Sequence, residues 1–332
     1  MRIAVVGAGA LGSLYAARLA AGGHPVSLLA RPAAAAAVAS GGIRVEGRIR
    51  VEGREGAAEP VRSIRVTTSA TDLAGADLLL LAVKTYHTAD TLPALAPLRG
   101  AVGAVCSVQN GVTKDVALAG VFGEGAVLGA MSLEGATLLA PGRVLWTSPT
   151  STAFGERDGR LTDRLESVVV AFRGAGLKAE ALPNVVAAMW AKFGIMVPGA
   201  TLSVLSRLPL YRLYQEPRLG ALFVALCREV QSLAEAHGVP WEDFPGMRVA
   251  TLCRLPTEEG VKLLAERGRA WEAAGATALK ASTLVDLERG RRTELADLVG
   301  YLAAEGARRG LYLPYASVLG EAVQAVAEAA AR

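Results

Sequence analysis

The chain is poor in residues that form covalent or metal cross-links. Only three of its 332 residues are cysteines. Cys106, Cys227 and Cys253 are far apart in the sequence and lack the spacing of metal ligands, so we interpret them as reduced, buried thiols. This pattern argues against a small disulfide-stabilised secreted domain, and no metal is expected.

Long runs of one residue class are scarce as well. The formal net charge is +4, but the lysines and arginines are dispersed, and no basic strip is interleaved with aromatic residues. Nucleic acid is therefore a poor candidate for a partner. The apolar stretches are interrupted by Gly, Pro or charge before they reach membrane-spanning length, and the apolar run from Ile3 leaves no room for a signal peptide. We expect a cytoplasmic protein with no membrane contact.

Length and composition indicate two globular domains. Hydrophobic residues make up 52% of the chain and charged residues 20%, which is typical of a well-packed protein. Strands alternate with helical stretches up to about residue 135, a pattern that predicts a doubly wound parallel sheet. The apolar runs at 76–83, 101–108 and 126–131 are predicted to be buried strands of that sheet.

The pattern changes near Pro183. Extended segments are expected at 143–155 and an amphipathic helix at 161–174. Beyond residue 183 the sequence predicts helices at 185–197, 201–208, 216–237, 257–275, 293–309 and 314–331. We therefore predict an α/β Rossmann-type domain over residues 1–182 and an all-α domain over residues 183–332, with a substrate cleft between them.

A short tandem repeat lies within the first domain. The sequence RVEGR occurs at 44–48 and again at 50–54. Its alternation of polar and apolar residues predicts a peripheral hairpin with polar faces.

The N-terminus carries a glycine pattern in an informative context. An apolar run at 3–6 leads directly into Gly7-Ala8-Gly9-Ala10-Leu11-Gly12, followed by a helix-period segment and a second apolar run at 26–29. This order of strand, glycine turn, helix and strand is typical of a dinucleotide-binding turn, in which the helix N-terminus binds the pyrophosphate. The alternative is an ordinary glycine turn of an unrelated α/β protein.

The second apolar run ends at Arg31. An NAD-selective site usually has Asp or Glu at this point to bind the ribose 2′-hydroxyl. A guanidinium would instead pair with a 2′-phosphate, so the sequence predicts NADP(H). A solvated arginine with no such role is the alternative.

Two further residues follow predicted strands of the sheet. Lys84 follows the run at 76–83, and Asn110 follows the run at 101–108. Ligands of open parallel sheets bind at the carboxyl ends of strands, so Lys84 could contact phosphate and Asn110 a ribose or carboxamide. Each residue could equally belong to a simple turn.

Two charged residues of the predicted helical domain are candidates for chemistry. Lys192 lies in the apolar stretch 185–197, where it is either a snorkelling side chain or a desolvated acid. Thr293 or a neighbour is expected to cap the helix predicted at 293–309, and Glu294 in its first turn is ordinarily stabilised by the helix dipole.

Together these residues resemble the ketopantoate reductase (2-dehydropantoate 2-reductase) family, over the whole chain. The matching parts are GAGALG at 7–12, Arg31, VKTY at 83–86, QNG at 109–111, the lysine of MWAKF at 189–193 and GRRTEL at 290–295. Ser282, twelve residues before Glu294, falls where that family has a substrate-binding serine. The glycine pattern is common to many dehydrogenases, whereas the combination in this order is specific.

The resemblance implies NADPH-dependent reduction of a 2-oxo acid to a 2-hydroxy acid, in pantothenate biosynthesis. It implies that Lys192 is the proton donor and that Glu294 orients substrate and cofactor. Asn110 would bridge cofactor and substrate, and Ser282 would bind the substrate carboxylate. The apolar helices of the second domain, and the association of related reductases through it, suggest a homodimer.

The chain departs from the family pattern beyond the lysine. Met196 and Ala200 occupy positions where the family usually has asparagines, and Ala296 stands where Asp is common. The chemistry is therefore better supported than the particular 2-oxo acid. Two alternatives stay open: a related 2-oxo acid or β-hydroxyacid dehydrogenase with another substrate, and a catalytically weak NADP(H)-binding sensor.

Overall fold

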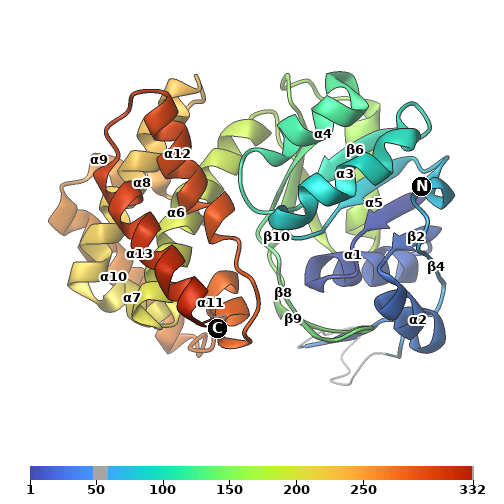
Figure 1. The fold of residues 1–332 in the computed structure, drawn as a ribbon, viewed down its shortest axis with the longest axis horizontal. Helices are drawn as coiled ribbons and strands as arrows, with labels where there is room; N and C mark the ends of the chain where they lie inside the picture. The colour runs from blue at the N-terminus through green and yellow to red at the C-terminus, as the bar shows by residue number, and fades with distance from the viewer. Residues whose placement is uncertain (48–58, 331–332) are drawn as a thin grey trace. The chain divides into compact units, whose positions relative to one another are not determined.

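The chain folds into two compact units, Met1–Val185 and Val186–Arg332. The structure is a computed structural model, and it describes residues 1–47 and 59–330 (Figure 1). The predicted fold class is confirmed, because a parallel sheet with helices is followed by a mostly helical region.

A parallel sheet forms the centre of the first unit. Its strand order is β4-β2-β1-β5-β6, so the sheet is wound outward from β1 in both directions, as in dinucleotide-binding sheets. The strands are β1 Ile3–Val6, β2 Val26–Leu29, β4 Ile64–Thr67, β5 Leu78–Leu81 and β6 Ala104–Ser107. The linking helices and 3₁₀ turns are α1 Ala10–Ala21, α2 Pro32–Gly41, η1 Ala70–Leu73, η2 Thr85–His87, α3 Thr88–Leu95, η3 Ala96–Leu98, α4 Lys114–Phe122 and η4 Glu124–Ala126.

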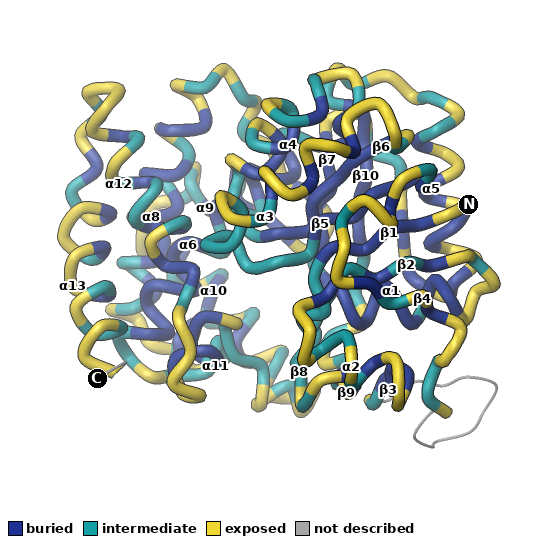
Figure 2. The backbone as a smooth tube through the Cα atoms, turned by 45° about the vertical axis from the view of Figure 1, so that its right-hand side comes forward, coloured by how far each residue is buried: buried dark blue, intermediate teal, exposed yellow. Residues whose placement is uncertain are grey.

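Alternate residues of β1 enter two separate cores. Ile3 and Val5 pack in one core with residues of α1 and of α5 (Asp163–Gly174). Ala4 and Val6 pack in the other with residues of α3 and α4. Every residue of β1 and β5 is buried (Figure 2). This explains the continuous apolar runs, because both faces of these strands are covered.

Hydrogen bonds between Arg2 and Asp77, the residues just before β1 and β5, align the two strands. The backbone N–H of Arg2 donates to Asp77 Oδ2 at 2.7 Å, and the Arg2 guanidinium donates to Oδ1 at 2.9 Å. The Asp77 N–H donates in return to the Arg2 carbonyl at 2.8 Å. These hydrogen bonds from Arg2 lower the pKa of Asp77, so the carboxylate is favoured. Ile3 then pairs with Leu78.

Two smaller sheets complete the first unit. One contains β7 Leu128–Ser132, β10 Ser151–Glu156 and β11 Lys178–Ala181, and the other contains β3 Arg44–Glu46, β8 Gly135–Ala140 and β9 Arg143–Ser148.

The polar faces predicted for the RVEGR repeat are wrong for its first copy, which contains β3. β3 pairs in parallel with the distant β9, and Val45 at its centre is 5% exposed. Val45 belongs to the same core as residues of α1, so burial of this side chain selected the distant partner. The second copy, at 50–54, lies outside the described residues.

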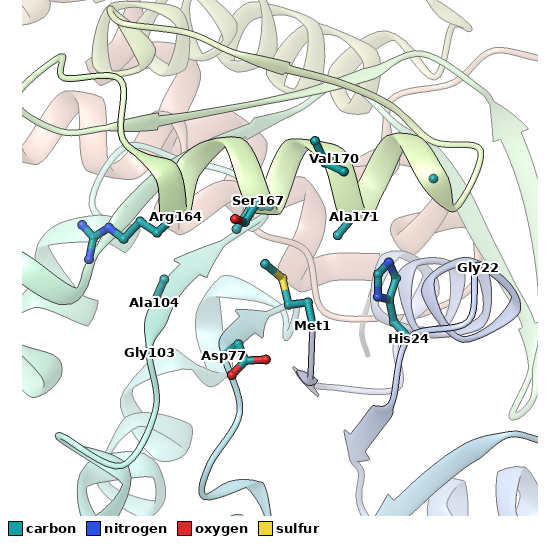
Figure 3. A pocket seen from close by; sticks show the side chains of 12 residues that line it. Met1, Gly22, His24, Asp77, Gly103, Ala104, Arg164, Ser167, Val170 and Ala171 are labelled. Atoms are coloured by element: carbon teal, nitrogen blue, oxygen red, sulfur yellow. The ribbon is translucent and has the colours of Figure 1, made fainter.

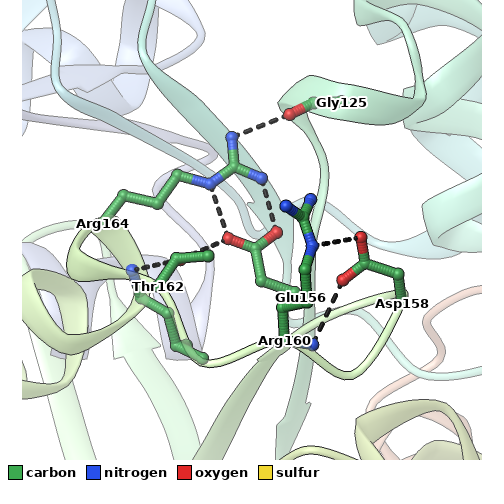
Figure 4. Close-up of polar contacts among 7 residues, drawn as sticks. Gly125, Glu156, Asp158, Arg160, Thr162 and Arg164 are labelled. Atoms are coloured by element: carbon green, nitrogen blue, oxygen red, sulfur yellow. Dashed lines mark hydrogen bonds and ion pairs between the residues drawn. The ribbon is translucent and has the colours of Figure 1, made fainter.

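Charged hydrogen bonds join β10 to the start of α5 (Figure 4). Arg164 donates from Nε to Glu156 Oε1 at 2.7 Å and from a terminal nitrogen to Oε2 at 2.5 Å, and its other terminal nitrogen donates to the Gly125 carbonyl at 2.7 Å. The Thr162 hydroxyl accepts the N–H of Leu165 and so caps α5. The hydrogen bonds from Arg164 lower the pKa of Glu156.

Helices make up most of the second unit. They are α6 Val185–Ser206, α7 Leu210–Gln215, α8 Pro217–Ala236, α9 Val249–Arg254, α10 Thr257–Ala273, α11 Ser282–Glu288, the 3₁₀ turn η5 Leu295–Asp297, α12 Val299–Arg308 and α13 Pro314–Ala330. Glu229 of α8 accepts the N–H groups of Tyr315 and Ala316 at 2.8 and 2.7 Å. The carboxylate thereby accepts two N–H groups of the first turn of α13 that have no partner within the helix.

α6 corrects two expectations. We predicted separate helices at 185–197 and 201–208, but one helix of 22 residues passes through Pro198. Proline removes one intrahelical hydrogen bond, and the extensive burial of α6 compensates for that loss. By length and composition α6 is also apolar enough to cross a membrane, so the expectation that no stretch reaches this length was wrong. In the structure 78% of its most apolar window is buried.

Candidate active site

The turn between β1 and α1 contains three glycines, of which two are required by its conformation and packing. Gly7 has a φ of +107°, a conformation that favours glycine. A Cβ on Gly12 would lie 1.9 Å from the Gly7 carbonyl oxygen, so α1 packs directly on the turn. A Cβ on Gly9 would meet the Ala82 carbonyl oxygen at 3.7 Å, which is an ordinary contact. Gly7 and Gly12 are thus required by the fold, whereas Gly9 has space in front of it.

The same turn presents backbone N–H groups at the carboxyl end of β1. Gly9 is the N-cap of α1, and the first intrahelical hydrogen bond runs from the Ser13 N–H to the Gly9 carbonyl at 2.9 Å. The N–H groups of the preceding residues, Ala10, Leu11 and Gly12, therefore precede the hydrogen-bond ladder. The side chains of this turn are uncharged, so the positive end of the helix dipole is available to an anion. These observations fit the pyrophosphate of a dinucleotide.

Arg31 is brought together with a residue that the sequence analysis missed. It is exposed, follows β2 and is the N-cap of α2. A terminal nitrogen of Arg31 lies 3.0 Å from Nε2 and 3.3 Å from Nδ1 of His87, which ends η2. Lys84 is the N-cap of η2, and its carbonyl accepts the His87 N–H at 2.9 Å. The available signal was the position of His87 in VKTYH, just beyond a strand end.

Asn110 lies on a turn held by its buried neighbour Gln109. The Ser107 hydroxyl donates to Gln109 Oε1 at 2.9 Å, and Gln109 Nε2 donates to the Thr88 hydroxyl at 2.8 Å. Gly111 has a φ of +87°, which reverses the chain after Asn110. The turn after β6 is therefore tied to the start of α3, and Gln109 is a positioning residue for it.

Lys192 lies in the first half of α6, in the second unit. It is half-buried, between Ala191 and Phe193, which are at most 1% exposed. The ring of Phe193 contacts Tyr301 of α12, with centroids 6.2 Å apart. The helix that carries Lys192 thus packs against α12.

Glu294 is buried, with 3% exposure, and leads into α12 through η5. The prediction that a helix starts at residue 293 was wrong, because α12 begins at Val299 and Glu294 is the N-cap of η5. Thr293 is therefore not the cap of α12. Ser282 is the first residue of α11 and is exposed.

The two positions that depart from the family pattern lie one and two turns after Lys192. Met196 is half-buried, and Ala200 is 4% exposed. Because residues four and eight positions apart follow one side of a helix, an apolar strip extends from Lys192 along α6.

A cavity of about 820 Å³ lies in the first unit, and none of the candidate site residues lines it (Figure 3). It is lined by one side of α5 and by Met1, Asp77 and Gly103, which precede β1, β5 and β6. These are the amino ends of the strands, whereas parallel sheets bind ligands at their carboxyl ends. Among the described residues, no three His, Cys, Asp or Glu side chains are grouped as metal ligands.

Comparison with known proteins identifies both parts of the chain. Residues 3–159 match the family model "Ketopantoate reductase PanE/ApbA", and residues 184–327 match "Ketopantoate reductase PanE/ApbA C terminal". The 2-dehydropantoate 2-reductase of Archaeoglobus fulgidus is 29% identical over 318 residues, which cover 93% of this chain and 92% of the relative.

Solved structures agree with this assignment. The PanE/ApbA family ketopantoate reductase of Ralstonia eutropha JMP134 has a TM-score of 0.79 at 27% identity, with all of both chains covered. D-mandelate dehydrogenase, solved with NADH and anilino(oxo)acetate, has the same TM-score at 18% identity, with 99% of both chains covered, and shares the fold. The chain therefore belongs to the ketopantoate reductase family, whose members are oxidoreductases that use a nicotinamide cofactor on a small 2-oxo acid.

Proposed function

We propose that the protein reduces 2-dehydropantoate (ketopantoate) to pantoate with NADPH, a step of pantothenate biosynthesis. The observation that carries the proposal beyond family membership is the contact between Arg31 and His87. It gathers two nitrogen-rich side chains at the end of β2, where NAD-selective sites usually have a carboxylate. A fork of guanidinium donors suits a 2′-phosphate, and His87 adds a second donor when its ring presents an N–H.

The remaining cofactor contacts are proposed from the same edge of the sheet. The N–H groups at 10–12 would hold the pyrophosphate, with Gly9 leaving room for its approach. Lys84 would add a positive charge, and Asn110 would bind the nicotinamide half through its amide. The Gln109 hydrogen bonds preorganise that turn.

Proton delivery is assigned to Lys192. The bound cofactor supplies a hydride to the carbonyl carbon of the substrate. The Lys192 ammonium would donate a hydrogen bond to the carbonyl oxygen and transfer a proton to it as negative charge develops. Partial burial strengthens that interaction, because fewer water molecules compete for the ammonium.

Glu294 would keep this lysine charged and in place. A buried carboxylate favours the protonated form of a nearby amine. Support comes from the packing between the two helical segments. Phe193, the neighbour of Lys192, contacts Tyr301 of α12, and the segment that contains Glu294 leads into α12. Ser282 would donate its hydroxyl to the substrate carboxylate.

Selectivity among 2-oxo acids should be modest. Ketopantoate carries a hydroxyl at the end remote from its carboxylate, and sites that hydrogen-bond such a group reject analogues lacking it by about 10⁴-fold or more. Met196 and Ala200 are apolar and cannot supply the amide hydrogen bonds that the family pattern would give after Lys192. We expect reduction of branched apolar 2-oxo acids alongside ketopantoate.

The test is steady-state kinetics with NADPH or NADH and a panel that includes ketopantoate and 2-oxoisovalerate. We expect kcat/KM to be highest for ketopantoate with NADPH, and a ratio over 2-oxoisovalerate below about 10⁴. A higher ratio would show that other residues bind the hydroxyl. NADPH binding without turnover of any 2-oxo acid would favour the sensor alternative, and higher kcat/KM for a different acid would favour a related dehydrogenase.

A further inference from the structure

The helical unit brings two of the three cysteines into contact. Cys227 of α8 is completely buried, whereas Cys253 of α9 is partly exposed. Their Sγ atoms are 3.4 Å apart although 26 residues separate them in sequence. The expectation of buried thiols was wrong for Cys253 only. The sulfurs need to approach by about 1.4 Å to reach disulfide bonding distance.

Arg228 holds the two helices in this position. Its Nε donates to the Cys253 carbonyl at 3.2 Å, and a terminal nitrogen donates to the Leu255 carbonyl at 2.7 Å. The other terminal nitrogen donates to the Thr257 hydroxyl at 3.0 Å. Because Arg228 directly follows Cys227, these bonds tie the backbone at one thiol to the backbone at the other.

The opposite end of α9 is fixed as well. Asp243 accepts the N–H groups of Ala250 and Thr251 at 2.7 and 3.0 Å and so caps the first turn of the helix. Both ends of α9 are therefore anchored by side chains, which hold the two thiols in contact.

The two thiols differ in the direction in which their surroundings shift the pKa. The contact with Cys227 lowers the pKa of Cys253, and the Trp241 indole and the Arg228 charge lower it further. The same contact and complete burial raise the pKa of Cys227 well above its ordinary value. The thiolate, which is the reactive form, is thus favoured on the cysteine that is partly exposed.

We propose that Cys253 and Cys227 form a reversible intramolecular disulfide with hydrogen peroxide as the oxidant, and that Cys253 reacts first. The Cys253 thiolate attacks a peroxide oxygen, so an S–O bond forms, the O–O bond breaks, and the hydroxide released becomes water on protonation. Cys227 then attacks the Cys253 sulfenic acid. The S–S bond forms, the S–O bond breaks, and the departing hydroxide takes the Cys227 proton. Two thiols are oxidised by two electrons, and the peroxide is reduced to water.

The disulfide would close the segment that packs on α6, the helix of Lys192, and its effect on that lysine rests on the proposed function. Trp241 lies between the two cysteines in the sequence. Its indole ring packs closely on Gly194 of α6, where a Cβ would come within 2.6 Å of the ring. Gly194 is two residues from Lys192. Oxidation therefore stiffens the chain that packs on α6 next to the proposed proton donor.

The first test uses mass spectrometry of the full chain treated with hydrogen peroxide. We expect a product about 2 Da lighter than the reduced chain, a peptide pair linked through Cys227 and Cys253, and reversal by dithiothreitol. Thermal unfolding of the oxidised protein should shift upward by about 5–10 °C, because a loop of this size is closed in the unfolded chain. Absence of the linked peptides after peroxide treatment would overturn the proposal.

Single-cysteine variants test the order of reaction. With Cys227→Ala, peroxide should leave a sulfenic acid on Cys253 that a cyclic diketone probe labels. With Cys253→Ser, the remaining Cys227 should stay unlabelled. Cys106→Ala is the matched control, because burial raises the pKa of Cys106 to about 12 and its removal should leave the disulfide unaffected. Labelling of Cys227 ahead of Cys253, or a disulfide lost with Cys106, would contradict the proposal. None of these readouts depends on reductase activity.

Discussion

Substitution by alanine should destabilise the protein at Gly12 but not at Gly9, although both residues belong to the same turn. In Gly12→Ala the new methyl group would start 1.9 Å from the Gly7 carbonyl oxygen, so α1 or the turn must move by more than 1 Å, roughly the shortfall from an ordinary contact. Overpacking of this kind costs about 1–3 kcal/mol. For a unit of this size the melting temperature should fall by about 2–12 °C, and cofactor affinity should fall with it.

Gly9→Ala is the matched control for stability. Gly9 has φ −76° and ψ −169°, which alanine adopts readily, and its Cβ would meet only an ordinary contact with Ala82. The melting temperature should be unchanged or slightly higher, because alanine restricts the conformations of the unfolded chain. The methyl group would nevertheless occupy the approach to the N–H groups of α1. Loss of one charged hydrogen bond there, about 1.5–3 kcal/mol, would weaken NADPH binding by roughly 10–150-fold.

The assays are thermal unfolding followed by circular dichroism and titration of NADPH by fluorescence. Wild-type affinity in Gly9→Ala would show that the pyrophosphate does not approach this residue. Wild-type unfolding in Gly12→Ala would show that α1 does not pack on the turn as the structure has it.

Four further outcomes are expected. Arg31→Ala should weaken NADPH binding by about 1.5–3 kcal/mol and leave NADH binding nearly unchanged; titration of both cofactors checks this, and equal losses would exclude a phosphate contact. Lys192→Ala should lower kcat about 10²–10⁴-fold with NADPH affinity retained, and near-normal kcat would mean that the lysine only snorkels. Arg164→Ala should destabilise the protein at pH 7, and denaturant titrations should show this deficit shrinking in acid. The sign follows because the pKa of Glu156 is lowered in the folded state, so its contribution is present above its ordinary value of 4.5 and is lost as the pH falls through the lowered one. Sedimentation should show a homodimer, and a monomer mass at every concentration would reject that expectation.

Much of the first unit could be predicted because its signals are local. The glycine turn, the helix after it and the strands on both sides follow one another within thirty residues, and each has its own periodicity. Strands such as β5 are apolar throughout because both faces are covered, and this composition is visible without knowledge of their neighbours.

The missed features depend on contacts between distant residues. His87 reaches Arg31 across 56 residues, and Cys253 reaches Cys227 across 26. β3 pairs with β9, 99 residues further along (Arg44 with Arg143). No local pattern encodes such pairings, because they are decided by which surfaces become buried together. The continuation of α6 through Pro198 has the same origin, since packing along the whole helix outweighs the local penalty of proline.

β5 consists of four leucines, Leu78 to Leu81, and this uniformity has a consequence for folding. A slip of β5 by one residue against β1 would still place a leucine at most positions of both cores, so side-chain burial hardly distinguishes the correct alignment from its neighbours. The information must come from the strand ends. Asp77 provides it, because its carboxylate and N–H meet Arg2 in one alignment only. An exposed ion pair, ordinarily of little value for stability, here selects among nearly equivalent alignments of the central sheet.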